Sequence, residues 1–354
     1  MEYPLWAWVV FFVVVLIALF VDVAIVNRHS HAPTRRETFI WSAVWVSLAL
    51  AFNGFIYWMV DSHFDNHTLA LTKTKEFFTG YLIELSLSVD NLFIFLLIFS
   101  YFKVPKQFQH RVLFWGIMGA LVMRMIMIFA GAELVERFHW IIYVFGFFLL
   151  YTGIKMFSSD DEEFDIENSR IVKLTTRFIP ITKEYDGEKF FVIKDGKRIG
   201  TLLLLVLIVV EFTDLIFAVD SIPAIFGITT DKFIVYTSNI FAILGLRTFF
   251  FLLADLADRF HYLKIALAFI LSFIGVKMLL PLVAEGFITV FGADGNSAFG
   301  QFMQSYQNKE FSQAIINISL GVVVGAIALA IILSIIFPPK QSKTEKIEES
   351  LDAE

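Results

Sequence analysis

The chain has no cysteine, and few of its 354 residues are charged. Without cysteine it has no disulfide, no thiolate metal site and no thiol nucleophile. Charged residues make up only 18% of the chain and hydrophobic residues 58%, an apolar share well above that of a soluble globular protein. The net charge of −6 provides no basic surface for nucleic acid. These shortages exclude a soluble domain and predict a protein surrounded by membrane lipid.

Long apolar runs take the place of charge in this sequence. A helix needs about 20 apolar residues to cross about 30 Å of hydrocarbon. Runs of this length predict nine transmembrane helices near 5–26, 39–60, 77–101, 109–131, 139–157, 201–226, 232–253, 261–284 and 313–337. The first run has no basic segment before it and no small-residue cleavage site, so we expect it to be retained. The predicted fold class is therefore all-α and polytopic.

The distribution of lysine and arginine predicts the orientation. If the connections alternate between the two sides, 20 basic residues lie on one side and 6 on the other. Because basic residues accumulate in cytoplasmic loops, we expect the N-terminus outside and the C-terminus in the cytoplasm.

Two parts of the chain resemble each other. ELSLSVDNLFIF and VEFTDLIFAVDSIPAIF place Asp90 and Asp220 at the same position, and the stretches that begin at Leu134 and Leu256 are identical at 9 of 23 positions. Each repeat contains three spans, and an odd number of crossings inverts the second copy relative to the first. The sequence thus predicts two inverted three-helix repeats, an arrangement typical of secondary transporters.

The predicted organisation has seven parts. They are two N-terminal helices (1–60), the first repeat (77–157), a cytoplasmic loop with a hairpin pattern (158–200), the second repeat (201–284), an extracytoplasmic loop (285–312), a ninth helix (313–337) and a cytoplasmic tail (338–354). The hairpin pattern is the alternation in KFFVIKDGKRIG. An acidic run before it, SSDDEEFDIEN, is read as a solvated linker or as a segment that gathers cations.

Charged residues inside the predicted spans are the strongest functional signal. At about 2.5–3.5 kcal/mol each, leaving all of them ionised against lipid would cost on the order of 20 kcal/mol, so they must face one another or a water-filled cavity. Helical spacing places Glu84 on one face with Ser88 and Asn91, and Glu211 and Asp214 on one face with Ser221. The eight residues are Asp22, Glu84, Asp90, Arg124, Glu211, Asp214, Asp220 and Arg247.

The polar neighbours predict a site for a hard cation. Asn91 follows Asp90, and Ser221 follows Asp220, so amide and hydroxyl oxygens join the carboxylates in both repeats. Oxygen ligands suit Mn²⁺, Mg²⁺ and Ca²⁺. Because Pro223 removes a backbone hydrogen bond, we expect the sixth span to be kinked or broken beside Asp220.

Other readings of the same residues stay open. Arg124 and Arg247 are counter-charges or switch elements, because a guanidinium does not bind a metal. Asn239 is an amide that helps in gating or merely joins helices, and Asp22 is a ligand or a side chain that reaches the interface. In the alternative interpretation, the charged residues together form a structural ion-pair network that only fixes helix register.

Three segments carry a family resemblance: GYLIELSLSVDN, VEFTDLIFAVDSIPAIFGITTD and TSNIFAILGLR. They resemble the signature segments of the TerC family, and most of all its Alx-like branch, within the LysE transporter superfamily. The resemblance covers the first to the eighth span and implies a bacterial membrane protein, with manganese export as the expected activity. It implies that the family's acidic positions are Asp22, Glu84, Asp90, Glu211, Asp214 and Asp220. The stretch 286–312 looks longer than in these relatives.

From the residues and the resemblance together we expect an exporter in the bacterial inner membrane. It would move Mn²⁺ or a related divalent cation in exchange for protons, with no permanently bound cofactor. The expected central site consists of Asp90, Asn91, Asp220 and Ser221. The competing interpretation is a membrane scaffold or stress-response protein whose charges are structural. No HExxH or GxSxG motif supports an enzyme.

Overall fold

The computed structural model describes residues 3–22, 35–158, 172, 175, 179–182, 184–194, 197–254, 262–291 and 309–337. These residues form ten helices and one two-stranded sheet. In chain order the elements are α1 (Leu5–Val21), α2 (Arg35–Phe64), α3 (His67–Tyr101), α4 (Lys106–Arg137), α5 (Ile141–Ser158), β1 (Phe191–Lys194), β2 (Lys197–Gly200), α7 (Leu202–Phe226), α8 (Lys232–Leu244), α9 (Leu246–Ala254), α10 (Tyr262–Phe291) and α12 (Lys309–Ile336).

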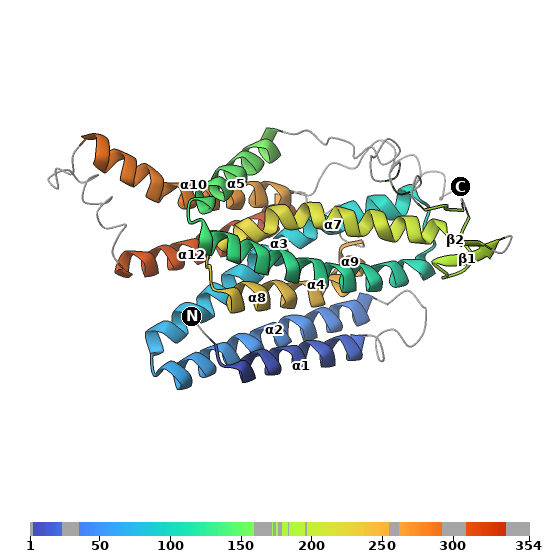
Figure 1. The fold of residues 1–354 in the computed structure, drawn as a ribbon, viewed down its shortest axis with the longest axis horizontal. Coiled ribbons are helices and arrows are strands. Elements are labelled where there is room, and N and C mark those ends of the chain that lie inside the picture. Colours follow the sequence, from blue (N-terminus) through green and yellow to red (C-terminus); the bar gives the residue numbers. More distant parts are fainter. Residues whose placement is uncertain are drawn as a thin grey trace.

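The helices lie side by side in an elongated bundle (Figure 1). The connection between α3 and α4 and the β1–β2 hairpin lie at one end, which we call the inner end; the α2–α3 and α7–α8 connections lie at the opposite, outer end. The basic residues predict that the inner end is cytoplasmic. α3 occupies the centre of the bundle and contacts α2, α7, α8, α9 and α12.

The surface of the bundle is that of a membrane protein. Five of the described helices, α2, α4, α7, α10 and α12, contain segments long and apolar enough to cross a bilayer. Large apolar side chains are exposed on the outside, among them Leu16 (64%), Phe147 (66%) and Ile335 (72%). A soluble monomer does not expose so much apolar surface. The all-α, polytopic membrane fold is therefore confirmed, and the count of nine spans with its orientation stays a prediction.

Two spans differ in detail from the expectation. α7 continues through Pro223 to Phe226, so the helix is not broken beside Asp220, and a kink there stays a prediction. Pro223 lies so close to the end of the helix that only a few residues follow it. The predicted span 232–253 instead consists of two helices, because α8 ends at Leu244 and α9 begins at Leu246.

The hairpin lies where the alternating sequence predicts it. Antiparallel pairing joins Phe191 to Gly200 and Lys194 to Lys197. Before it, the hydroxyl of Tyr185 donates to the carbonyl oxygen of Phe102 at 2.7 Å, which ties this segment to the inner end of α3. Predicted features in 159–171, 292–308 and 338–354 lie outside the described residues.

α5 and α10, the third helices of the two predicted repeats, make a close and reciprocal contact. A Cβ atom at Gly153 would lie 2.7 Å from the amide nitrogen of Ser272 and 2.8 Å from the carbonyl oxygen of Ala268. A Cβ atom at Gly275 would lie 2.6 Å from the nitrogen of Leu150 and 2.8 Å from the oxygen of Gly146.

These two contacts are copies of each other in the repeat alignment. Gly153 corresponds to Gly275, and the residues that the first glycine approaches correspond to those that the second approaches. Such a pairing is what a two-fold axis between α5 and α10 requires. It supports the predicted inverted repeats.

A single added methyl group at this contact should destabilise the protein. Gly275→Ala places its Cβ against backbone atoms that cannot rotate away, and overpacking of this kind costs about 1–3 kcal/mol. We expect the thermal unfolding midpoint in detergent to fall by about 2–10 °C. Gly321→Ala in α12, where no atom lies within 4 Å, is the matched control. Equal midpoints for the two variants would contradict the close contact.

Candidate functional site

Arg124 is fully buried near the middle of α4. Its Nη1 donates to Oε1 of Glu84 in α3. Its Nη2 and Nε donate to the two carboxylate oxygens of Asp214 in α7, at 3.1 and 3.4 Å. Glu84 and Asp214 are 0% and 4% exposed. One guanidinium therefore joins one acid from each predicted repeat.

Two polar side chains complete this arrangement. The Asn239 amide in α8 donates from Nδ2 to Oε2 of Glu84 at 2.8 Å and accepts from Nη1 of Arg124 at 3.4 Å. The Ser88 hydroxyl lies 3.5 Å from Oε1 of Glu84. We call Glu84, Ser88, Arg124, Asp214 and Asn239 the arginine network. It connects the four helices α3, α4, α7 and α8.

The arginine network is negatively charged when its acids are ionised. Two carboxylates and one guanidinium give a formal charge of −2 + 1 = −1. In a water-poor interior this charge is costly, and it is relieved when a cation or a proton binds. The geometry thus combines oxygen ligands with an electrostatic attraction for positive charge.

Glu211 lies one turn from Asp214 in α7 and is partly buried. Its carboxylate fills the space above Gly119 of α4, where any Cβ atom would overlap it. A larger residue at 119 would force this carboxylate to move, so the glycine lets the acid approach α4 this closely. Glu211 belongs to the same region as the arginine network without a direct bond to Arg124 among the described contacts.

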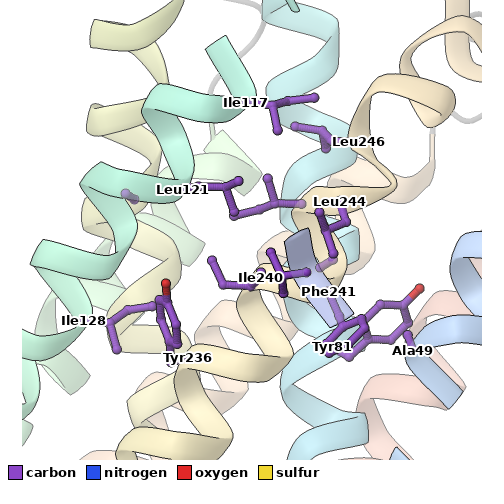
Figure 2. Packing of buried hydrophobic residues seen from close by; sticks show 14 of the residues in the cluster. Ala49, Tyr81, Ile117, Leu121, Ile128, Tyr236, Ile240, Phe241, Leu244 and Leu246 are labelled. Carbon is purple, nitrogen blue, oxygen red and sulfur yellow. The ribbon is translucent and has the colours of Figure 1, made fainter. Parts of the chain in front are cut away.

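A small cavity lies beside Asp214, on the inner side of the arginine network. Its lining includes Phe95, Leu113, Gly116, Ile117, Asp214 and Leu246, and Asp214 is the only ionisable residue among the described lining residues. Figure 2 shows Ile117 of α4 and Leu246 of α9 opposite each other at one end of this region, with Leu121 and Leu244 next along. Apolar walls around a single carboxylate strengthen its interaction with an entering cation.

Two buried polar atoms near the predicted central site lack partners. Within the part of the chain that the structure describes, Nδ2 of Asn91 and Oγ of Ser221 make no hydrogen bond, although these residues are 3% and 0% exposed. Such orphan groups are rare in native interiors and often mark a site for an ion or water. Asn91 and Ser221 follow Asp90 and Asp220 directly in the chain.

The remaining predicted site residues are placed less fully. Asp90, Asp220 and Arg247 lie within α3, α7 and α9, and their side chains are outside the described part of the structure. Asp22 is buried at the C-terminal end of α1. Among the side chains that are described, no group of three or more His, Cys, Asp or Glu residues is arranged to hold a metal ion.

Sequence reasoning missed a second polar group at the outer end. Lys73 in α3 contacts Glu76 at 2.9 Å and Asp231, the N-cap of α8, at 3.0 Å. Thr229 donates to Glu76 at 2.7 Å, and the hydroxyl of Tyr3 donates to Asp231 at 2.9 Å. We call these five residues the outer cluster.

The outer cluster closes the bundle where α3, α8 and the N-terminal segment meet. Burial, together with the Asp231 carboxylate, raises the pKa of Tyr3, so its hydroxyl keeps the proton that it donates. From sequence, Lys73 and Glu76 resemble an ordinary solvated flank of a helix. Only the fold brings Asp231 to them from far along the chain.

Comparison with known proteins adds the family. Residues 69–342 match the TerC family of integral membrane proteins. The chain belongs to the TerC family. The match begins in α3 and includes every member of the arginine network. No solved structure matches the chain.

Several relatives of this TerC protein are bacterial membrane proteins. One from Escherichia coli, provisionally named membrane-bound redox modulator Alx, is 50% identical over 274 residues, which cover 77% of this chain and 85% of the relative. An uncharacterized membrane protein of Myxococcus xanthus is 48% identical, with 77% and 82% covered. One from Rickettsia bellii is 39% identical, with 77% and 87% covered.

Removal of the shared guanidinium should be strongly destabilising. Arg124→Met leaves Glu84 and Asp214 buried without a counter-charge, and the loss of one partner of a buried ion pair costs about 3–5 kcal/mol. We expect a large fall in the thermal midpoint at neutral pH. Arg137→Met on the same helix, which breaks only an exposed pair with Glu133, is the control.

Neutralising the acids as well provides the complementary test. In the triple variant Arg124→Met, Glu84→Gln, Asp214→Asn no unpaired charge remains, so much of the lost stability should return. If Arg124→Met unfolds at the same temperature as Arg137→Met, the ion pairs in the arginine network contribute no stability.

Proposed function

We propose that this TerC protein is a secondary transporter that exports Mn²⁺, or a closely related hard divalent cation, from the cytoplasm across the bacterial inner membrane. The observation that carries the proposal is a buried network in which two acids share one guanidinium, with a small cavity beside Asp214 on the inner side. Structural ion pairs alone need neither an excess acid nor a cavity beside it.

The ligands that we assign to the cation are oxygen atoms from both predicted repeats. Asp90 and Asn91 would bind from α3, and Asp220 and Ser221 from α7, with Asp214, Glu211 and Glu84 along the route. The Ser221 hydroxyl oxygen, which is buried and has no hydrogen-bond partner among the described residues, supports this assignment. Carboxylate, amide and hydroxyl oxygens favour Mn²⁺, Mg²⁺ or Ca²⁺ over softer metals.

Protons are the proposed counter-ion. A carboxylate in a water-poor site binds either a metal or a proton, because it is costly to leave ionised and empty. Outward release of the cation would then be followed by protonation of the same acids. Arg124 balances part of their charge while no cation is bound, and its hydrogen bonds to Glu84 and Asp214 are the contacts that an incoming cation must weaken.

A structural role is the competing proposal. It is favoured by one observation: Glu84, Arg124 and Asp214 already satisfy one another. In that case the protein is a membrane scaffold and moves nothing. The redox role in the name of the Escherichia coli relative would need an external group here, because this chain has no thiol. The sequence has no motif that places a nucleophile beside a general base, and for this reason we propose a transporter rather than an enzyme.

Mn²⁺ flux tests the proposal directly. In inverted proteoliposomes, where the cytoplasmic side faces the medium, we expect Mn²⁺ uptake by the native protein and a loss of at least about tenfold in Asp90→Asn and Asp220→Asn. Asp186→Asn, at an exposed position near the hairpin, is the control and should transport normally. Folded but inactive variants support a transport site. Absence of uptake and of Mn²⁺ binding by the native protein would favour the scaffold.

Proton exchange is checked in the same vesicles. With an acidic lumen, export of protons into the medium should accompany Mn²⁺ uptake, and collapse of the pH gradient should slow it. Mn²⁺ uptake that is unchanged by the gradient, with no proton counterflow, would exclude the exchange mechanism and leave the exporter itself standing.

A further inference from the structure

The two predicted repeats supply equivalent residues on opposite sides of the arginine network. Glu84 and Asp214 occupy the same place in the matching segments that contain Asp90 and Asp220. In the second helices of the repeats, the alignment of Arg124 with Arg247 also pairs Leu121 with Leu244. Figure 2 shows these two leucines next to each other, between α4 and the α8–α9 region. Equivalent residues that meet in this way lie near a two-fold axis.

The inner pocket has an equivalent on the outer side. Its α4 lining includes Gly116, Ile117 and Ala120, close to Asp214. In the repeat alignment, the equivalent positions are Asn239, Ile240 and Ile243 of α8, close to Glu84. Figure 2 places Ile117 and Ile240 on opposite sides of the two leucines.

On the outer side, the equivalent space is filled by side chains. Two of these side chains are larger than their counterparts on the inner side. Where the inner side has Gly116, the outer side has an amide that fills the space and is bonded to Glu84 and Arg124. Asn239, Ile240 and Ile243 are at most 1% exposed. Ile243 is also larger than its counterpart Ala120. The inner pocket and the closed outer side are therefore two versions of one structural motif.

Two further contacts hold the outer side shut. Gly80 of α3 lies so close to α8 that a Cβ there would be 2.8 Å from Oγ of Ser238. Beyond it, the outer cluster ties Lys73 and Glu76 of α3 to Asp231 at the start of α8. Both contacts involve α3 and α8, so separation of these helices would open the outer side.

We propose that the cation leaves through an outer route lined by Ile240, Ile243 and Gly80, the repeat equivalent of the inner pocket, and that the Asn239 side chain is the gate that closes it. The inference rests on the proposed transport function and adds the exit path and its gate. In the structure the amide bridges Glu84 and Arg124. When a cation draws the acids toward itself, those hydrogen bonds are lost and α8 separates from α3.

The absence of native cysteine makes the route measurable, because one introduced cysteine is the only thiol in the protein. Ile117→Cys reports the inner pocket and Ile240→Cys the outer route. Each is exposed to a charged, membrane-impermeant thiosulfonate applied from one side, in vesicles of known orientation, with and without Mn²⁺. Thr68→Cys, exposed near the outer start of α3, is the positive control. Ile126→Cys, 56% exposed on the apolar surface of α4, is the lipid-facing negative control.

We expect Ile117→Cys to react from the cytoplasmic side and Ile240→Cys to react slowly from the outer side. Adding Asn239→Gly, which copies the inner residue, should accelerate the outer reaction of Ile240→Cys about tenfold, since one or two hydrogen bonds that favour the closed state are removed. The exchange Gly116→Asn should slow the inner reaction of Ile117→Cys. This second variant tests the gate independently if Asn239→Gly does not fold.

The outcomes separate the route from the transport function. If Ile240→Cys does not react from outside in either background while Thr68→Cys does, the outer route is wrong even if Mn²⁺ flux is normal. If it reacts, and faster in Asn239→Gly, the route and gate stand even where native vesicles take up no Mn²⁺, in which case the proposed cation is wrong. Labelling of Ile126→Cys at the rate of Ile240→Cys would also overturn the route, because access would then be unspecific.

Discussion

The ion pairs of Arg124 are the constraint on which the rest of this structure depends. Where water is absent, a guanidinium must find hydrogen-bond acceptors within the protein. Four hydrogen bonds from Arg124 reach Glu84, Asp214 and Asn239, which come from three other helices. The relative positions of α3, α4, α7 and α8 are thereby fixed by directional bonds, which apolar packing between lipid-embedded helices does not provide.

Glycines let the charged groups and helices come this close. Gly119 makes room for the Glu211 carboxylate, and Gly116 leaves open the space beside Asp214. Gly153 and Gly275 bring the backbones of α5 and α10 together. In lipid, where burial of apolar surface does not drive helices together, close backbone approach supplies dispersion and polar contacts instead. The close contacts at these glycines thus hold the helices together in addition to the ion pairs of Arg124.

The two predicted repeats are nearly symmetric, and the differences between them connect this architecture to function. Glu84 and Asp214 are equivalent acids, yet a single arginine holds both, and only Asp214 lines a pocket. The position that is Gly116 on one side is Asn239 on the other. Nearly equivalent halves that differ at single positions such as this one allow two conformations of similar free energy, as a two-state transporter requires. Excess negative charge in the same place favours occupation by a cation.

The sequence by itself determined the class of the fold and the residue types of the site. Apolar runs predict the helices. Charged and amide residues within these runs predict Glu84, Arg124, Asp214 and Asn239 as partners or gates, because lipid tolerates such groups only when they contact one another. It did not determine which acid pairs with which base, that α7 continues through Pro223, that Gly116 lines a pocket, or that Tyr3, Lys73, Glu76 and Asp231 meet at the outer end. Those features depend on contacts between residues far apart in the chain. Helical periodicity specifies the face on which a residue lies, and only packing of whole helices decides what lies opposite that face.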